Sequence, residues 1–337
     1  MGVYRHADRK TPPTIAGKRL WTSKKTRKNF AVAKIPSATA SVWNVSACEA
    51  TKPAMRLSRR DFLRASTLLA GGGGSAAAYA RFIEPDWFEV TSKTVGLPHL
   101  TKPLRLVHLS DLHASLDVPG ALIEAGIDLA IAQKPDLVAI TGDFRTRDIP
   151  DPAGYTRILA KLTAAAPVFA CLGNHDGHID PRHGTVHRFA RALLTALKDA
   201  GIHLLHNAAE TVDIGGQRLR IAGIGDLWTR EHWPDAALTP RRPEALPVLV
   251  LDHNPDGKDE LRPYDWDLLC CGHTHGGQFR IPVVNWAPYA PVNDRRFIEG
   301  LHRWQGRYLH VTRSVGNLRG LRFCCRPEVS LLKLVPA

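Results

Sequence analysis

The sequence predicts an α/β domain that fills most of the chain. After residue 81, short apolar runs alternate with stretches of helical periodicity, which is the pattern of alternating strands and helices. Polar residues follow directly after several of these apolar runs. The 337 residues are also enough to bury a large hydrophobic core. Because functional groups in α/β sheets gather outside the carboxyl ends of strands, the polar clusters predict where a site lies.

The elements follow in order along this region. Strands are expected where short apolar runs end in polar residues or turn signals: 88–97, 103–113, 135–144, 167–176, 202–206, 210–214, 218–225, 247–252, 266–272, 307–315 and 328–335. Helices are expected where apolar residues recur at three- and four-residue spacing: 120–134, 155–165 and 186–202. Pro135 ends the first of these helices.

The high net charge of +13 is concentrated before the folded region. Residues 1–54 hold 11 Lys or Arg and two acids, whereas residues 81–337 hold 30 basic and 29 acidic residues. A nearly neutral folded region does not favour a nucleic-acid-binding module, which only the overall charge would suggest. We therefore expect that the protein does not bind nucleic acid. We also expect it to be a monomer.

Residues 55–80 have the layout of an export signal. Ser58, Arg59 and Arg60 precede Phe62 and Leu63, an Ala/Gly-rich stretch follows, and Ala78-Tyr79-Ala80 offers a small-x-small cleavage pattern. This resembles a twin-arginine (Tat) signal. It implies the Tat machinery as a partner and a periplasmic or extracytoplasmic location, with possible membrane association.

Residues 1–54 are unusual ahead of such a signal. The only methionines are Met1 and Met55, and Met55 lies three residues before the Ser-Arg-Arg motif. We expect 1–54 to be a disordered basic extension or a mis-assigned start. We expect 81–103 to form a linker and the opening strand, and 104–337 the catalytic domain.

Five expected strand ends carry side chains that bind metals. The candidate ligands are Asp111, His113, Asp143, Asn174, His253, His273 and His275. Imidazole and carboxylate ligands without thiolates suit Mn, Fe or Zn. Seven ligands exceed what one ion takes, so the sequence predicts two divalent ions that share a bridging carboxylate. The neighbouring glycines, Gly142, Gly173 and Gly272, are expected to let the backbone bend before the ligands.

The order D-x-H, G-D, G-N-H-D, H and G-H-T-H resembles the calcineurin-like metallophosphoesterase superfamily over residues 85–337. "GHTHGGQFRIP" (272–282), "DHNPD" (252–256) and "RPEVSLLKL" (326–334) are similar to its Tat-exported or membrane-anchored branch. The resemblance implies a four-layer αββα sandwich, in which two mixed β-sheets pack face to face with helices outside.

The resemblance also implies a role for each residue. Asp111, His113 and His275 would hold the first metal, and Asn174, His253 and His273 the second. Asp143 would bridge the two ions. A water acidified between the ions would attack a phosphodiester or phosphomonoester. His175 would stabilise the transition state or protonate the leaving oxygen, and Asp176 would orient His175.

The substrate itself is left open. That branch includes bacterial phosphodiesterases and a UDP-2,3-diacylglucosamine pyrophosphatase of lipid A synthesis, so the phosphoester could be lipid- or nucleotide-linked. Export argues against the pyrophosphatase, whose lipid substrate is made on the cytoplasmic side. A non-catalytic, metal-binding envelope protein is a further alternative. Asp252, which precedes His253, departs from the expected apolar residue, and it could perturb that ligand or form a supporting hydrogen bond.

Overall fold

The first of two β-sheets carries half of the expected site. The computed structural model describes residues 72–337 except 178, 181–184 and 187. In sheet order, the first sheet contains β1 (Glu89–Leu97), β14 (Glu328–Pro336), β2 (Leu104–Leu109), β3 (Leu137–Thr141), β4 (Val168–Cys171) and β7 (His203–Leu204). β14 runs antiparallel to β2, whereas the other neighbouring strands are parallel, so the sheet is mixed.

The second sheet is also mixed. In sheet order, it contains β12 (Gly300–Trp304), β13 (Arg307–Val311), β11 (Leu268–Cys271), β10 (Val248–Leu251), β9 (Gln217–Gly223) and β8 (Ala208–Ile214). Its four central strands are parallel, and the two edge strands are antiparallel to their neighbours. A two-stranded pair, β5 (Ile179–Asp180) with β6 (Thr185–Val186), follows β4.

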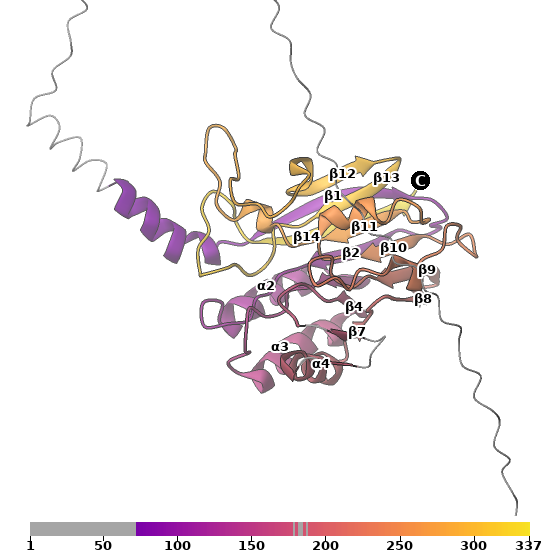
Figure 1. Cartoon of the computed structure of the whole chain (residues 1–337), viewed down its shortest axis with the longest axis horizontal. Helices are drawn as coiled ribbons and strands as arrows, with labels where there is room; N and C mark the ends of the chain where they lie inside the picture. Colours follow the sequence, from indigo (N-terminus) through magenta and orange to yellow (C-terminus); the bar gives the residue numbers. More distant parts are fainter. Residues whose placement is uncertain (1–71, 178, 181–184, 187) are drawn as a thin grey trace, which may run out of the picture. The chain divides into compact units, whose positions relative to one another are not determined.

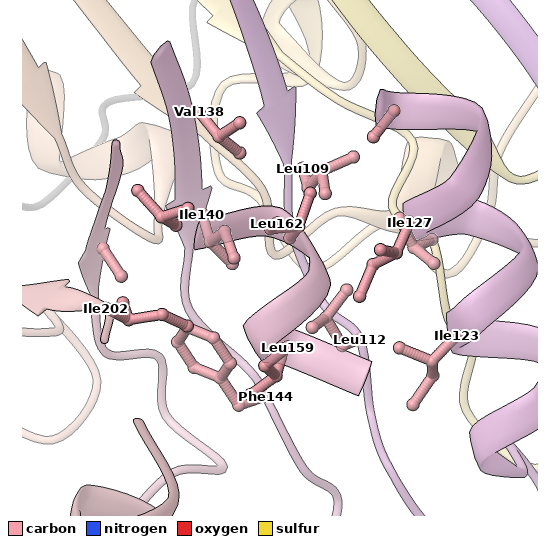
Figure 2. Close-up of a cluster of buried hydrophobic side chains, with 14 of the residues drawn as sticks. Leu109, Leu112, Ile123, Ile127, Val138, Ile140, Phe144, Leu159, Leu162 and Ile202 are labelled. Atoms are coloured by element: carbon pink, nitrogen blue, oxygen red, sulfur yellow. The ribbon is translucent and has the colours of Figure 1, made fainter. Parts of the chain in front are cut away.

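Three helices cover one face of the first sheet (Figure 1). They are α2 (Gly120–Ala132), α3 (Pro152–Ala165) and α4 (Arg188–Asp199). Ile123 and Ile127 of α2 pack with Leu159 and Leu162 of α3 over the side chains of β2 and β3, as Figure 2 shows. The helical spacing in the sequence therefore marks the faces that bury these side chains.

Alternation along the strands separates two further hydrophobic layers. In β2, Val107 and Leu109 belong to the helix-facing core, while Leu104 and Leu106 pack against the second sheet. The outer face of the second sheet is covered by loops and by short 3-10 helices, including η2 (Pro234–Ala236) and η3 (Pro255–Asp259). The predicted sandwich of two mixed sheets flanked by helices is confirmed, with a fourth layer of 3-10 turns and loops.

Two strand features were not expected from the sequence. β12 alternates apolar and polar residues that are mostly half-exposed, as an edge strand does, so it lacks the apolar run by which the other strands were recognised. The two-residue strands β5 and β6 are too short to give a periodic signal.

The amino-terminal predictions fall largely outside the described residues. Segment 1–54 and most of the expected signal, up to residue 71, lie outside the described residues. Residues 72–82 are helical and are followed by the 3-10 helix η1 (Glu84–Asp86) and then β1. Within residues 72–337, apart from the gaps noted above, helices are all too short or too polar to cross a bilayer.

The helix layer gives the first testable prediction. Ile127 is fully buried between α2 and the first sheet, so Ile127→Ala should lower the free energy of unfolding by about 2–5 kcal/mol. Leu116 is 90 % exposed, so Leu116→Ala should change the free energy of unfolding by less than about 0.5 kcal/mol. Urea denaturation followed by circular dichroism measures both. Equal effects of the two substitutions would show that α2 does not pack as described.

Candidate metal centre

All seven expected ligands come together at one edge of the sandwich. The loops after β2, β3 and β4 of the first sheet supply Asp111, His113, Asp143 and Asn174. The loops after β10 and β11 of the second sheet supply His253, His273 and His275. Because both sheets present the carboxyl ends of parallel strands at this edge, residues more than 160 positions apart meet there.

The ligand atoms form two groups. In the first, His113 Nε2 lies 3.1 Å from His275 Nε2, which in turn lies 3.4 Å from Asp111 Oδ1. In the second, His253 Nε2 lies 3.2 Å from both Asp143 Oδ2 and His273 Nδ1. Asp111, His113 and His275 could hold one ion, as could the set of Asp111, Asp143 and His253.

Asp143 lies between the two groups. Its Oδ2 is 3.5 Å from His113 Nε2 of the first group and 3.2 Å from His253 Nε2 of the second. Its Oδ1 accepts a hydrogen bond from the backbone N–H of His175 at 2.8 Å. A carboxylate in this place can contact ions in both groups, which is the arrangement that a bridging ligand needs.

The ligand loops have an unusual backbone. Five of the seven candidate ligands have positive φ angles: Asp111 (49°), His113 (50°), Asp143 (53°), His273 (66°) and His275 (51°). Residues other than glycine rarely adopt this conformation, which costs about 1–3 kcal/mol each and persists where the surroundings enforce it. Strain of this kind concentrates at functional sites.

The glycines before the ligands work in two different ways. Gly142 has a φ of 81° and makes the bend that the sequence predicted. Gly173 and Gly272 instead permit close approach. A Cβ at Gly173 would overlap the Asp143 carboxylate, and one at Gly272 would overlap Ser110 Oγ and Asp111 Oδ2.

Neighbouring oxygens fix the orientation of the ligands. His253 Nδ1 donates to the backbone carbonyl of Thr141 at 2.7 Å, since a carbonyl only accepts. Its Nε2 is therefore the nitrogen that faces Asp143. Ser314 Oγ donates to Asp111 Oδ2 at 2.9 Å, and His113 Nδ1 lies 3.1 Å from Thr146 Oγ1. Thr146 and Ser314 could not be identified from the sequence, because hydroxyl residues are common and Ser314 lies 203 positions from its partner.

His175 and Asp176 have separate roles. His175 Nδ1 lies 3.3 Å from the carbonyl oxygen of Thr146. The two carboxylate oxygens of Asp176 accept from the backbone N–H groups of Phe144 and Gly173, at 2.7 and 2.8 Å. Thr146 thus contacts the imidazole directly, whereas Asp176 joins the loops that carry Asp143 and Asn174; a role of Asp176 in orienting His175 stays a prediction. Burial and the charge of Asp143 raise the pKa of Asp176 to about 8.

Burial keeps most of the imidazoles neutral. It lowers the pKa of His113 to about 4, that of His273 to about 3 and that of His275 well below its ordinary value. His253 differs, because burial would lower its pKa but the Asp143 and Asp111 carboxylates raise it well above the usual range. Neutral imidazoles beside buried carboxylates are the state in which these side chains bind cations.

The residues fit divalent metal ions. Asp111, Asp143 and four histidines are buried around two points, with nitrogen lone pairs and carboxylate oxygens facing one another at 3.1–3.5 Å. Asn174 Oδ1 is buried and has no hydrogen-bond partner in the described part of the chain. Buried acceptors that lack a donor are costly, and a shared cation would satisfy them.

A cavity of about 230 Å³ opens onto these groups. Its lining includes Asp143, Asn174, His175, His273 and His275 from the centre, together with Trp228, Tyr289 and Leu318. The half-exposed indole of Trp228 lies edge-on to the His273 ring, with the ring centroids 4.3 Å apart. The centre can therefore receive a small charged group from solvent, with aromatic surface beside it.

Comparison with known proteins identifies the family. Residues 104–277 match the calcineurin-like phosphoesterase family. The chain is 40 % identical to phosphodiesterase YaeI of Escherichia coli, over 83 % of this chain and 100 % of that protein. The chain belongs to the calcineurin-like phosphoesterase family. It is a hydrolase.

Two other relatives cover most of this phosphoesterase. The metallophosphoesterase YkuE of Bacillus subtilis is 30 % identical over 83 % of this chain and 98 % of its own length. The UDP-2,3-diacylglucosamine pyrophosphatase LpxG of Chlamydia trachomatis is 28 % identical over 76 % of this chain and 92 % of its own. The expected resemblance to the superfamily is confirmed.

Asp252, the departure from the family pattern, forms a supporting hydrogen bond in this phosphoesterase. Its Oδ2 lies 2.9 Å from His232 Nε2, and His232 Nδ1 lies 2.8 Å from Glu260 Oε2. Burial would lower the pKa of His232, but these carboxylates raise it to about 9. Asp252 is thus paired with His232, which offsets its charge.

The described cysteines Cys171, Cys270, Cys271, Cys324 and Cys325 are free, and the two on β11 are buried apolar residues of the sheet. His178, His183 and His187, which follow the Gly-Asn-His-Asp loop, lie outside the described residues.

Close approach at Gly272 gives the second prediction. Gly272→Ala should push Ser110 and Asp111 apart from the loop of His273, and weaken metal binding about 10–100-fold. Isothermal titration of the metal-free protein with Mn²⁺ measures this. Gly73→Ala is the matched control, since Gly73 is helical with nothing within 4 Å of an added Cβ. Unchanged Mn²⁺ affinity in a folded Gly272→Ala protein would contradict the described packing.

Proposed function

We propose that this protein is a phosphodiesterase whose centre holds two divalent ions. Asp111, His113 and His275 would bind one ion, and Asn174, His253 and His273 the other. Asp143 would contact both. The observation that carries the proposal is the placement of Asp143 Oδ2 within 3.5 Å of a histidine from each group. Mn, Fe and Zn all suit these nitrogen and oxygen ligands.

When bound, such ions acidify a water molecule near neutral pH and offset the charge on phosphoryl oxygens. The chain contributes the remaining functions. The backbone N–H of His175 holds Asp143, and the Thr141 carbonyl fixes which His253 nitrogen faces inward. Burial of these groups excludes water from the ligand atoms, which strengthens their electrostatic interactions.

His175 in its imidazolium form is proposed to protonate the leaving oxygen through Nε2, because a neutral ring whose Nδ1–H donates to a carbonyl has no proton on Nε2. It lines the cavity, and the Thr146 carbonyl holds its Nδ1, so Nε2 is the nitrogen available to a substrate. Its ring lies edge-on to that of His113, with the centroids 5.1 Å apart, which keeps it beside the metal centre. His175 therefore acts on substrate without being a side-chain ligand.

A diester substrate is supported by two observations. The full-length relative at 40 % identity is named a phosphodiesterase. Trp228 and Tyr289 also border the cavity and offer aromatic surface for the second substituent of a diester. The relative named a UDP-2,3-diacylglucosamine pyrophosphatase supports a second candidate, a lipid-linked phosphoester.

Export by the twin-arginine pathway is part of the proposal. Its support is the Ser-Arg-Arg-x-Phe-Leu motif at 58–63, together with the proposed metal centre, which requires a folded domain. Proteins that use this pathway are exported after they fold, so a metal acquired inside the cell would remain in place. An extracytoplasmic enzyme would meet a different set of phosphodiesters from those of lipid A synthesis.

Substitutions can separate the proposed bridging role of Asp143 from the proposed proton-donating role of His175. Asp143→Asn should lose both the second equivalent of bound metal and activity, because the bridging side chain loses its negative charge. His175→Ala should keep two equivalents of metal and lower kcat about 10²–10⁴-fold on bis(p-nitrophenyl) phosphate. Metal content by plasma mass spectrometry and steady-state kinetics give the two readouts. Full activity of Mn-loaded Asp143→Asn protein would refute the assignment.

Export is tested separately. Replacing Arg59 and Arg60 together by lysine should leave the precursor in the cytoplasm of cells that have a twin-arginine system. Arg64→Lys in the same segment should export normally. Cell fractionation with immunoblotting distinguishes these outcomes, and normal export of the double variant would show that the motif is not used.

A further inference from the structure

A prominent apolar loop lies beside the cavity. We call residues 279–289 the apolar loop; in Figure 1 an orange loop of this region stands out from the strands. Its tip is aliphatic, with Val283 fully exposed and Val284 66 % exposed. Trp286 and Tyr289 follow, at 54 % and 77 % exposure. Single exposed apolar residues are ordinary, but four within seven positions form a patch that marks a binding surface.

The apolar loop is held in place from its base. Ile281 N donates to the Trp286 carbonyl at 2.8 Å, which closes residues 282–285 into a tight turn. Arg280 contacts Asn285 Oδ1 at 3.0 Å and Glu299 at 2.7 Å. Val283 itself has a φ of 71°, which is a rare conformation for a β-branched residue. The turn therefore presents an aliphatic tip at the cost of backbone strain.

Aromatic contacts connect the apolar loop to two other parts of the protein. Phe279 stacks on Phe323 with ring centroids 5.0 Å apart, and Phe323 lies 6.3 Å from Tyr79 of the first described helix. In the other direction, Phe279 lies 6.4 Å from Tyr289, which lines the cavity. A continuous aromatic strip thus runs from the helix at 72–82 to the mouth of the site.

Exposed cations lie at the helix end of this strip. Arg81 stacks over the exposed Phe82 ring at 5.4 Å, and its guanidinium would be the nearest contact of a Cβ at Gly320. Arg319, the neighbour of Gly320, is also exposed. Within the described residues, neither guanidinium is engaged in a hydrogen bond or ion pair, and that of Arg81 lies beside an exposed apolar ring. That combination matches an interface where phosphate groups border hydrocarbon.

We propose that the apolar loop inserts into the surface of an anionic lipid bilayer and that Arg81 and Arg319 meet its headgroups. A protruding aliphatic tip followed by Trp and Tyr suits a bilayer, in which aromatic rings lie at the headgroup level. A peptide partner would require a groove, and this surface projects outward. The sequence also places the apolar residues Phe62, Leu63, Leu68 and Leu69 ahead of the same helix.

The orientation has a consequence for the substrate. Because Tyr289 belongs both to the strip and to the cavity, insertion would bring the cavity mouth to the bilayer surface. The substrate would then be a phosphodiester at that surface, such as a phospholipid headgroup. This second statement rests on the proposed phosphodiesterase function, whereas insertion of the loop does not.

Insertion can be measured at one position. In the full-length chain with Cys48→Ser and Cys324→Ser, Val283→Cys would carry an NBD fluorophore; the other cysteines are buried. Vesicles of phosphatidylcholine with phosphatidylglycerol should shift the NBD emission to the blue and raise its intensity severalfold. Leu116→Cys, equally labelled, is the control, because Leu116 is 90 % exposed on a different loop. The metal-free protein should respond in the same way, which separates insertion from catalysis.

Each alternative to insertion of the apolar loop predicts a different experimental result. If only the apolar residues ahead of the helix bind membranes, the protein will float with vesicles while the NBD at position 283 remains unchanged, and the proposal fails. A blue shift that grows with protein concentration in the absence of vesicles would assign the surface to a second copy of the chain. Val283→Asp with Val284→Asp should abolish the vesicle-dependent shift of an NBD at Trp286→Cys but leave hydrolysis of a soluble diester unchanged.

Discussion

Two buried carboxylates, Asp111 and Asp143, impose the main constraint on this structure. Each lies within reach of histidines from both sheets, and neither is exposed to water that could stabilise its charge. Ser314 Oγ and the backbone N–H groups of His175 and His273 offset part of the cost of burying them, and cations bound between the carboxylates and the imidazoles would offset more. The left-handed backbone of five candidate ligands adds to that cost. Binding of divalent ions at this site would therefore be coupled to the folding of these loops.

The sandwich architecture follows from the same constraint. His253 on the second sheet must donate to the Thr141 carbonyl at the end of β3, while His273 N donates to Asp111 after β2. These bonds join the two sheets at the edge where the ligands meet. Leu106, Leu249 and other side chains between the sheets supply the burial that keeps this edge in register. Because the site is divided between two sheets, its rigidity depends on the packing between them.

The sequence was informative where the signal is local. Apolar runs that end in Asp, Asn or His predicted both the strands and the edge at which Asp111, Asp143 and His253 meet. The sequence did not reveal residues that contact the ligands from distant positions in the chain and belong to common residue types. Thr146 and Ser314 position ligands through hydroxyls, which carry no distinctive spacing. The hydrogen bonds that Asp176 accepts from the backbone amides of Phe144 and Gly173 could not be inferred from its adjacency to His175 in the sequence. β12 was missed because edge strands need no apolar run.

Anomalous diffraction from crystals of Mn-loaded protein tests the two-ion centre most directly. Two manganese peaks about 3.5–4 Å apart are expected. The Asp143 carboxylate should contact both peaks, with His113 and His275 on one and His253 and His273 on the other. A single peak, or two peaks that do not share Asp143, would contradict the account.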